Sequence, residues 1–324
     1  MHRVAGSILI CVLAFLTGCG SSGHAGERYY LVATNIKIPY WQTAAAGLAK
    51  SASEMQVKAE MTGPDTYDPK AEVEEFRRVL ASKPSGIMVS PADPELLRQP
   101  ISDAIASGIP VITVDSDAPG SQRLIFVGTN NYQAGMTGGK LLAQKLKGKG
   151  NVVVLSIPAQ SNLDERLRGY RDALVSSPGI SILDVLDVHG SPEAAFDQTK
   201  QLLETGKTPV NAFVCLEALA CKEVADVLER KNVHDKIVIA MDTDDATLSW
   251  IDKGVITATI AQRPYTMAYF GLKLVDDLQH HRPKPLNAHW DQILSSPIPA
   301  LVDTGATLVD TGNIAQIRRL IESK

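Results

Sequence analysis

The sequence lacks the composition of a nucleic-acid-binding protein. Among its 324 residues, 32 are lysine or arginine and 36 are aspartate or glutamate, so positive charge is not in excess. Nucleic-acid-binding domains usually carry a basic face, and we therefore expect no nucleic-acid partner. Hydrophobic residues make up 44% of the chain and the mean hydropathy is -0.01. This composition is typical of a soluble globular protein, and the length favours two domains.

Catalytic motifs are also missing. The sequence has no GxSxG nucleophile elbow, no HExxH motif and no CxxC pair. The stretch "GTNNYQAG" has neither the GxGxxG nor the GxxxxGK[ST] spacing of a phosphate-binding loop. We therefore expect a protein that is not an enzyme and has no cofactor. A glycosidase activity is the alternative from a different class, and a hydrolysis assay would reveal it.

No cluster of residues in the sequence indicates a metal site. Asp244 and Asp245 precede a predicted helix that begins near Ala246, and we interpret them as its caps. His280 and His281 follow the end of another predicted helix, where a positive charge is favourable. We expect no metal.

Cysteine is scarce, and the four cysteines have different predicted roles. Cys11 lies in a hydrophobic N-terminal run of residues 4–16, and Cys19 ends the following "LTGC". This run is short for a membrane span and has the position of a signal peptide. Small residues before Cys19 resemble a bacterial lipobox, which implies cleavage before this residue and a lipid on its sulfur. An ordinary secretory signal with a chance cysteine is the alternative.

These assignments predict a lipid-anchored protein of the periplasm or cell surface. Residues 1–18 form the lipoprotein signal peptide in this interpretation, and residues 19–28 form a flexible tether. Cys215 and Cys221 remain, outside the reducing cytoplasm. Cys215 ends a predicted strand and Cys221 lies about one turn inside the next helix, so a disulfide between them is feasible. Two buried free thiols are the alternative.

Short runs rich in valine and isoleucine alternate with longer amphipathic segments along the rest of the chain. The first series of runs comprises residues 29–34, 57–61, 86–90 and 111–115. The second series comprises residues 151–156, 180–188, 211–215, 236–242 and 256–262. Helices of the second series are predicted to begin near Gln133, Asp164, Pro192, Glu217 and Ala246. This alternation predicts an α/β fold with two similar lobes, each a parallel sheet covered by helices on both faces.

Polar residues stand where the predicted strands end. Ser90, Asp115, Asp242 and Gln262 each end a run, and residues 34–41 follow the first one. Ligands of open α/β sheets bind at the carboxyl ends of the strands. The sequence therefore predicts a ligand site built from these polar groups.

Seven motifs occur in an order that resembles a known family. They are "IPYW", "PSGIMVSPAD", "GIPVITVDSDA", "VGTNNYQAG", "ERLRGYRDAL", "VIAMDTDD" and "TATIAQRP". Over residues 29–285 they resemble the sugar-binding proteins of bacterial ABC importers, in particular the ribose- and galactose-binding branch. The resemblance implies a type I periplasmic binding protein fold, with two Rossmann-like lobes joined by a three-crossing hinge.

The resemblance also implies domain boundaries. The crossings should fall near residues 129–130, 262–263 and 286–289. Lobe one would comprise residues 27–129 plus 263–288. Lobe two would comprise residues 130–262 plus 289–324, which include a C-terminal hinge segment.

The family's binding residues are matched at six positions. Tyr40 and Trp41 match an aromatic pair that stacks on a sugar ring, and Asp115 matches an aspartate that accepts from two hydroxyls. Arg166 matches an arginine that donates to the sugar. Asp242 and Gln262 match two further polar anchors. The implied ligand is a monosaccharide or polyol, delivered by a monomeric protein to an ABC permease; a receptor that reports the sugar to a chemoreceptor or histidine kinase is the alternative.

The chain departs from the family pattern in ways that concern specificity. Ser116 stands where ribose binders often have arginine, and Ser90 and Leu216 stand where asparagines are common. Lys37 in the first loop is a further candidate that could supply a cation. These departures favour another pentose, a hexose or a polyol over ribose, and an acidic sugar is less favoured.

Each matched residue also has a purely structural interpretation. Tyr40 and Trp41 could be core residues at a helix start. Asp115 and Asp242 could cap loops. Arg166 could pair with a neighbouring charge on a solvated helix face.

Overall fold

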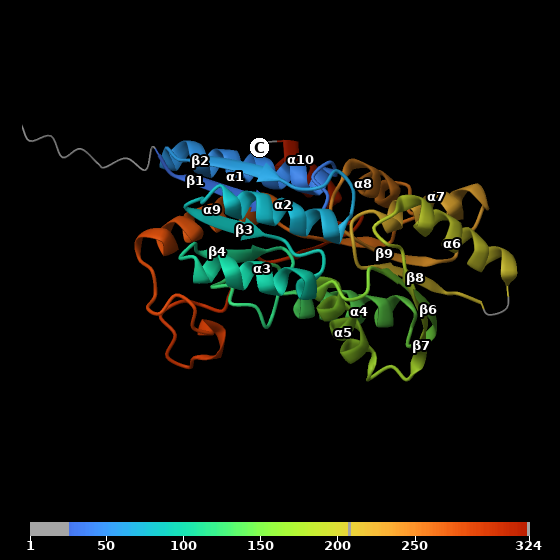
Figure 1. The fold of residues 1–324 in the computed structure, drawn as a ribbon. Coiled ribbons are helices and arrows are strands. Elements are labelled where there is room, and N and C mark those ends of the chain that lie inside the picture. The colour runs from blue at the N-terminus through green and yellow to red at the C-terminus, as the bar shows by residue number, and fades with distance from the viewer. Residues whose placement is uncertain (1–25, 207–208, 323–324) are drawn as a thin grey trace, which may run out of the picture.

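Two lobes lie side by side in the computed structural model, which describes residues 26–206 and 209–322 (Figure 1). Each lobe is built around one sheet and has its own hydrophobic core. The prediction of an α/β fold with two lobes of mainly parallel strands is confirmed. The predicted signal peptide and its Cys19 lie outside the described residues.

The first sheet forms the centre of the first lobe. Its strand order within the described residues is β11-β5-β4-β3-β1-β2, and every neighbouring pair is parallel. The strands are β1 (Arg28–Val32), β2 (Lys58–Thr62), β3 (Gly86–Val89), β4 (Val111–Val114), β5 (Phe126–Gly128) and β11 (Leu301–Asp303). The helices of this lobe are α1 (Pro39–Met55), α2 (Pro69–Ala81), α3 (Pro94–Ala106) and α9 (Pro264–His280). Figure 1 shows the orange α9 among the blue and cyan elements, because the chain returns to this lobe late in the sequence.

The second sheet repeats this order in the second lobe. Its order is β12-β10-β9-β8-β6-β7, and only the pair of β10 and β12 is antiparallel among the described strands. The strands are β6 (Lys149–Ser156), β7 (Gly179–Asp187), β8 (Ala212–Cys215), β9 (Ile237–Met241), β10 (Ala258–Ala261) and β12 (Thr307–Val309). The helices of this lobe are α4 (Asn131–Lys145), α5 (Ser161–Leu174), α6 (Pro192–Thr205), α7 (Ala220–Arg230), α8 (Asp245–Asp252) and α10 (Ile314–Glu322). A 3-10 turn, η1 (Trp290–Gln292), precedes β11.

Local sequence explains where several of these elements begin. The side chain of Asp68 accepts from two backbone N–H groups in the first turn of α2, and Asp93 does the same for α3. Proline follows each aspartate, which is the favoured first residue of a helix. Asp244 caps α8 in the same manner, as predicted. The central strands β3 and β4 are buried at every residue, which explains their continuous apolar sequence.

The chain passes between the sheets three times. It leaves the first sheet after β5, returns after β10, and leaves again between β11 and β12. The third passage therefore lies at residues 304–306, and the prediction of residues 286–289 is wrong. β11 pairs with β5, and Trp290, Ile298 and Val302 pack against the first core. Residues 289–303 thus belong to the first lobe rather than to the second.

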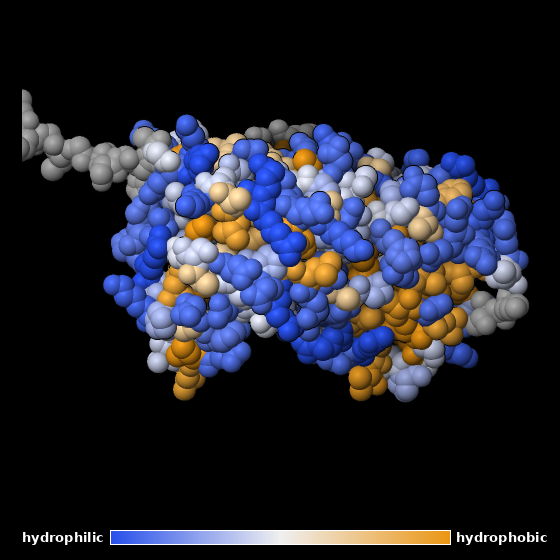
Figure 2. Space-filling view, viewed as in Figure 1, coloured by the Kyte–Doolittle hydropathy of each residue, from blue (hydrophilic) through white to orange (hydrophobic). Residues whose placement is uncertain are grey.

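The surface is mainly polar. Figure 2 shows a largely hydrophilic face, on which hydrophobic side chains gather mostly over the second lobe. Most of the large apolar side chains are enclosed in the two cores. Within the described ranges, no helix has both the length and the apolar character that a membrane span requires.

Candidate functional site

Two aspartates end equivalent strands of the two lobes. Asp115 follows β4 and Asp242 follows β9, and these strands occupy the same place in their sheets. Both residues have left-handed backbones, with φ of 66° and 68°. Aspartate tolerates this conformation better than most residues that carry a side chain. The sharp turn of the backbone directs both carboxylates into the space between the lobes, where they line one cavity.

This cavity lies at the carboxyl edges of both sheets. It contains about 470 Å³ of space not filled by atoms, open in part to solvent. Six of the sequence-predicted residues line it: Tyr40, Trp41, Asp115, Arg166, Asp242 and Gln262. The structure thus brings together side chains that lie more than 200 residues apart in the sequence.

The wall from the first lobe is formed by aromatic rings and neutral donors. The Tyr40 hydroxyl donates to Oδ1 of Asp115 over 2.6 Å, and Ser90 donates to Oδ2 over 3.3 Å. Burial raises the pKa of Asp115, and the nearby Arg166 guanidinium opposes this effect. Ser90 does not itself line the cavity, so its role is to hold the carboxylate.

The two aromatic rings are fixed in different ways. Trp41 is 2% exposed, and its Nε1 donates to Thr34 Oγ1 over 3.1 Å and to Asn35 Oδ1 over 2.9 Å. Tyr40 and Trp41 meet edge to face, with ring centroids 5.3 Å apart. Their planes are 83° apart, so the pair forms a rigid apolar corner rather than a flat wall.

Arg166 is the cation of the cavity. Its side chain is 2% exposed and donates to Asn131 Oδ1 over 2.8 Å, to the Leu216 carbonyl over 2.6 Å and to Gln262 Oε1 over 2.6 Å. The structure therefore excludes the interpretation that it pairs on a solvated helix face. A guanidinium has five N–H groups, so two remain that can donate to a ligand.

Close helix packing positions this arginine. A Cβ added to Gly135 of α4 would lie 2.1 Å from the backbone oxygen of Arg166. Only glycine at this point lets α4 approach α5 so closely. The same contact places Asn131, near the start of α4, beside the guanidinium.

The amide of Gln262 connects groups from both sides of a crossing. Its Oε1 accepts from Thr129 Oγ1 over 2.9 Å and from Arg166, while its Nε2 donates to Asp242 over 3.1 Å. Thr129 follows β5 of the first sheet, whereas Arg166 and Asp242 belong to the second lobe. Nε2 also lies 3.4 Å from the second oxygen of Asp242, so the amide orients the other polar groups of the cavity.

The carboxyl group of Asp242 is strongly perturbed. Burial raises its pKa from 3.8 to about 7, and the charge of Asp115 adds to this rise. Arg166 and the amide of Gln262 act in the opposite direction. Two carboxylates therefore share one guanidinium across the cavity.

The remaining predicted residues have other positions. Lys37 is 66% exposed and pairs with Asp65 over 3.7 Å, so it does not line the cavity. Cys215 and Cys221 form a disulfide with a Cα separation of 5.6 Å. The bridge closes the loop that carries Leu216 and Glu217, next to the cavity.

Several lining residues were not predicted as ligand contacts, among them Glu217, Asn35 and Asn162. Glu217 accepts from the backbone N–H groups of Leu219 and Ala220 over 2.6 and 2.7 Å, and burial raises its pKa. Asn35 and Asn162 are 8% and 5% exposed. Both asparagines follow predicted strands, so the rule that found Asp115 could have found them too.

The two lobes also touch at the rim of the cavity. Ser161 Oγ, at the start of α5, donates to the backbone oxygen of Asp117 over 2.6 Å and accepts from its N–H over 3.0 Å. Asp117 is held in turn by Arg123, through two bonds of 2.7 Å. The cavity is therefore bounded by direct contacts between the lobes.

Comparison with known proteins gives consistent results. A family model described as a periplasmic binding protein domain matches residues 29–282. The ribose import binding protein RbsB of Haemophilus influenzae is 25% identical over 266 residues, which cover 80% of this chain and 87% of that protein. A sugar ABC transporter (sugar-binding protein) of Bacillus halodurans has a solved structure that is 32% identical, with a TM-score of 0.78 over 90% of this chain and 99% of that one. The solved XylFII-LytSN complex is 26% identical, with a TM-score of 0.78 over 88% of this chain and 98% of the matched one.

Proposed function

The chain belongs to the periplasmic binding protein domain family, and from this premise we propose that it captures a monosaccharide or polyol outside the cytoplasm for an ABC importer. One observation carries the proposal: Asp115, Arg166 and Asp242, from two lobes, line a single cavity. The similarity to a ribose import binding protein and to a sugar-binding protein of an ABC transporter supports it.

The chemistry of the cavity suits a sugar. A hydroxyl group both donates and accepts, and the cavity offers carboxylates that accept beside a guanidinium that donates. Hydrogen bonds to charged groups contribute roughly 1.5–3 kcal/mol each. The rings of Tyr40 and Trp41 provide an apolar surface for the C–H face of the sugar. A neutral polyhydroxylated ligand can use all of these groups at once.

We propose that the ligand joins the lobes as it binds. Asp115 approaches it from the first lobe, while Arg166 and Asp242 approach it from the second. A ligand that contacts both lobes favours the arrangement in which Ser161 meets Asp117. Small-angle scattering should then show a smaller radius of gyration with the ligand than without it.

The side chains around the strand ends bear on ligand identity. The hydroxyl of Ser90 donates to Asp115. Leu216 contributes only its backbone oxygen, which accepts from Arg166. Fewer side-chain donors are thus available than in the ribose-binding pattern. We propose a pentose other than ribose, a hexose or a polyol as the ligand.

A thermal-shift screen of purified residues 20–324 tests this function. The panel should contain ribose, other pentoses, hexoses, polyols and an acidic sugar. A ligand at 100 times its Kd stabilises the folded state by about 2.7 kcal/mol, which raises Tm by several degrees. Asp115→Asn is the matched control, and its 10-fold or weaker binding should reduce the stabilisation at the same ligand concentration to about 1.4 kcal/mol or less. Absence of a shift with every neutral compound would contradict the proposal, and release of product from glycosides would indicate an enzyme instead.

We further propose that the protein is a monomer anchored by lipid at Cys19. The hydrophobic run that ends in "LTGC" supports the anchor. Wild-type protein should partition into the detergent phase after processing, and Cys19→Ala should accumulate as an unprocessed or soluble form. Cleaved Cys19→Ala in the detergent phase would contradict lipidation. Light scattering should give the mass of one chain.

A receptor that reports its sugar to a membrane sensor is the second candidate function. The similarity to a chain of the XylFII-LytSN complex favours it, because that protein was solved together with a second protein. The sugar site would be the same and only the partner would differ. Permease and ATPase genes beside the gene of this protein would support import, and a histidine kinase or chemoreceptor gene would support the second candidate.

A further inference from the structure

A tyrosine of the first lobe reaches across to the second lobe beside the cavity. Tyr67 lies in the loop between β2 and α2, and it is one of three aromatic residues among the described residues that line the cavity. The other two, Tyr40 and Trp41, pack in the first core, whereas Tyr67 packs against the core of the second lobe. The ring of Tyr67 therefore joins the two lobes at the cavity.

The second lobe accommodates this ring with a glycine. Gly190 lies in the loop between β7 and α6 and lines the same cavity. A Cβ added to Gly190 would lie 2.7 Å from the Cβ and 2.9 Å from the Cγ of Tyr67, which is too close for carbon atoms that are not bonded. The backbone of Gly190 is left-handed, with φ of 64°, but the preceding His189 has φ of 51° and carries a side chain. The close approach of Tyr67 therefore explains the glycine better than the backbone conformation does.

Hydrogen bonds within the first lobe hold Tyr67 in place. Its hydroxyl donates to the backbone oxygen of Ala92 over 2.9 Å, and the N–H of Ala92 donates to Oε2 of Glu72 over 2.8 Å. Glu72 is 0% exposed, so this support lies inside the lobe. These bonds position the ring without any group of the second lobe.

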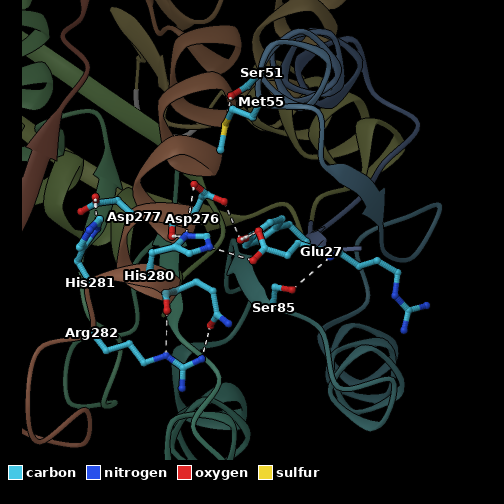
Figure 3. A network of polar contacts seen from close by, with 12 residues as sticks. Glu27, Ser51, Met55, Ser85, Asp276, Asp277, His280, His281 and Arg282 are labelled. Carbon is cyan, nitrogen blue, oxygen red and sulfur yellow. Dashed lines mark hydrogen bonds and ion pairs between the residues drawn. The ribbon is translucent and has the colours of Figure 1, made fainter. Parts of the chain in front are cut away.

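The first lobe can carry this ring as one body, because its late helix is bonded to its first strand. Figure 3 shows Asp276 and His280 of α9 pointing toward Glu27, which immediately precedes β1. His280 Nε2 lies 2.9 Å from Glu27 Oε1. We therefore expect Tyr67 and Asp115 to approach the second lobe together when the lobes close.

We propose that Tyr67 is a further ligand-binding residue of the cavity, whose ring contacts the sugar and is covered by Gly190 only when the lobes are closed. This proposal rests on the proposed function, because it takes a sugar as the ligand. Tyr67 adds an apolar surface to the corner of Tyr40 and Trp41, where the loop after β7 bounds the cavity. Because the ring meets the second lobe only in the closed arrangement, it should slow the dissociation of a sugar and leave its association unchanged.

A cross-link tests the contact between the lobes without any sugar. In residues 20–324, Tyr67→Cys is combined with Gly190→Cys, and disulfide formation under mild oxidation is followed by mass spectrometry of digested protein. A disulfide needs Cβ atoms about 3.5–4.5 Å apart, so a displacement of about 1 Å from the 2.7 Å separation allows it. Tyr67→Cys with Gly254→Cys is the matched control, because Gly254 has φ of 77° and an added Cβ would meet no atom within 4 Å.

The Gly190 pair should form the additional disulfide, and the Gly254 pair should not. No disulfide in the Gly190 pair, or equal amounts in both pairs, would overturn the proposal. A mixture of D-xylose, D-arabinose, D-galactose and D-mannitol should accelerate the cross-link. A cross-link that forms but is not accelerated by these compounds would keep the contact between the lobes and contradict the proposed sugar function instead.

Binding kinetics with each of these four compounds test the contact with the sugar. Tyr67→Ala should raise the dissociation rate constant about 10-fold and leave the association rate constant unchanged, whereas Tyr67→Phe keeps the ring and should have a smaller effect. Gly190→Ala should also raise the dissociation rate constant, and Gly254→Ala should not, although both substitutions strain a left-handed backbone. Circular dichroism verifies that the variants are folded. The proposal is overturned if folded Tyr67→Ala releases the sugar as wild type does, or if both glycine variants behave alike.

Discussion

Each lobe places a carboxylate at the equivalent point of its own sheet, but the two lobes surround this group differently. In the first lobe, Asp115 accepts from the neutral hydroxyls of Tyr40 and Ser90. In the second lobe, Asp242 accepts from the amide of Gln262, which is itself held by Arg166. Strand order and backbone conformation are repeated, whereas the donors are not.

This difference assigns distinct tasks to the two halves. The first lobe contributes rings and hydroxyls to the cavity, and the second contributes its guanidinium. Arg166 lowers the pKa of Asp115 as well as that of Asp242, so a charge from one lobe acts on both. The repeated fold fixes the positions of Asp115 and Asp242. The residues around each aspartate differ between the lobes, and they determine its pKa.

Removal of the shared guanidinium should have the largest effect. Arg166→Met leaves two buried carboxylates without their cation and should lower the free energy of unfolding by about 3–5 kcal/mol. Sugar affinity should fall by at least two orders of magnitude, because binding loses its only buried cationic donor among the described lining residues. Denaturant unfolding and calorimetric titration measure the two effects.

Arg168→Met is the matched control for that experiment. Arg168 lies on the same helix but is 55% exposed and pairs with Glu165 on the surface. Its replacement should change stability by less than about 1 kcal/mol and leave affinity intact. If both substitutions had equal effects on stability and affinity, Arg166 would contribute no more than an exposed arginine of the same helix, and the prediction would be wrong.

Replacement of each aspartate in turn tests whether both lobes hold the ligand. Asp115→Asn and Asp242→Asn keep a side chain that tolerates the left-handed backbone. Each should weaken sugar binding by about 1.5–3 kcal/mol, roughly 10- to 150-fold. Calorimetry on both variants measures the losses. A loss confined to one variant would mean that the ligand contacts a single lobe.

The disulfide exists in the second lobe alone among the described residues. Simultaneous Cys215→Ala and Cys221→Ala should lower the free energy of unfolding by about 2 kcal/mol, because the closed loop is short. Denaturant unfolding of wild type with and without reductant should show the same difference. If reductant also destabilised the double variant, the effect would not come from this bridge.

The stability of the protein should depend on pH through the raised pKa of Asp242. Folded Asp242 keeps its proton up to pH about 7, whereas the unfolded chain releases it near 3.8. Between these values the folded state binds more protons, so stability of the ligand-free protein should fall as pH rises. One proton contributes at most about 1.4 kcal/mol per pH unit.

Unfolding of Asp242→Asn between pH 4.5 and 7.5 provides the comparison. The variant should show a shallower decrease than wild type over this range. A slope that is unchanged would mean that Asp242 is ionised throughout and that its burial is compensated fully.

Much of the fold could be predicted because buried parallel strands have distinctive sequences. The runs that became β3, β8 and β9 are apolar in every strand residue, β4 has Thr113 as its one polar residue, and helices separate them. β5, β11 and β12 have only three residues each, which is too short for a periodic pattern to emerge. The third crossing lies after β11. Because this strand was not predicted, the boundary between the lobes was placed too early in the sequence.

Six residues that line the cavity could be predicted from the sequence, but their hydrogen bonds could not. Strand ends indicated Asp115 and Asp242, because the carboxyl edge of a sheet follows from the order of elements. The use of Gln262 by Thr129 and Arg166 depends on three segments that meet only in the folded chain. The exposure of Lys37 likewise depends on its pairing with Asp65, which no local pattern indicates.

The contact between Ser161 and Asp117 at the rim of the cavity should affect how long a ligand stays bound. Ser161 bonds to the backbone N–H and oxygen of Asp117, and it is not among the residues that line the cavity. The lobes cannot separate at this point without breaking these two bonds, so we expect the rate of sugar release to depend on the rim as well as on the cavity. Among related complexes, affinity differences arise mostly from dissociation rates. The residence time of a sugar could therefore change through Ser161 while the groups that recognise it remain the same.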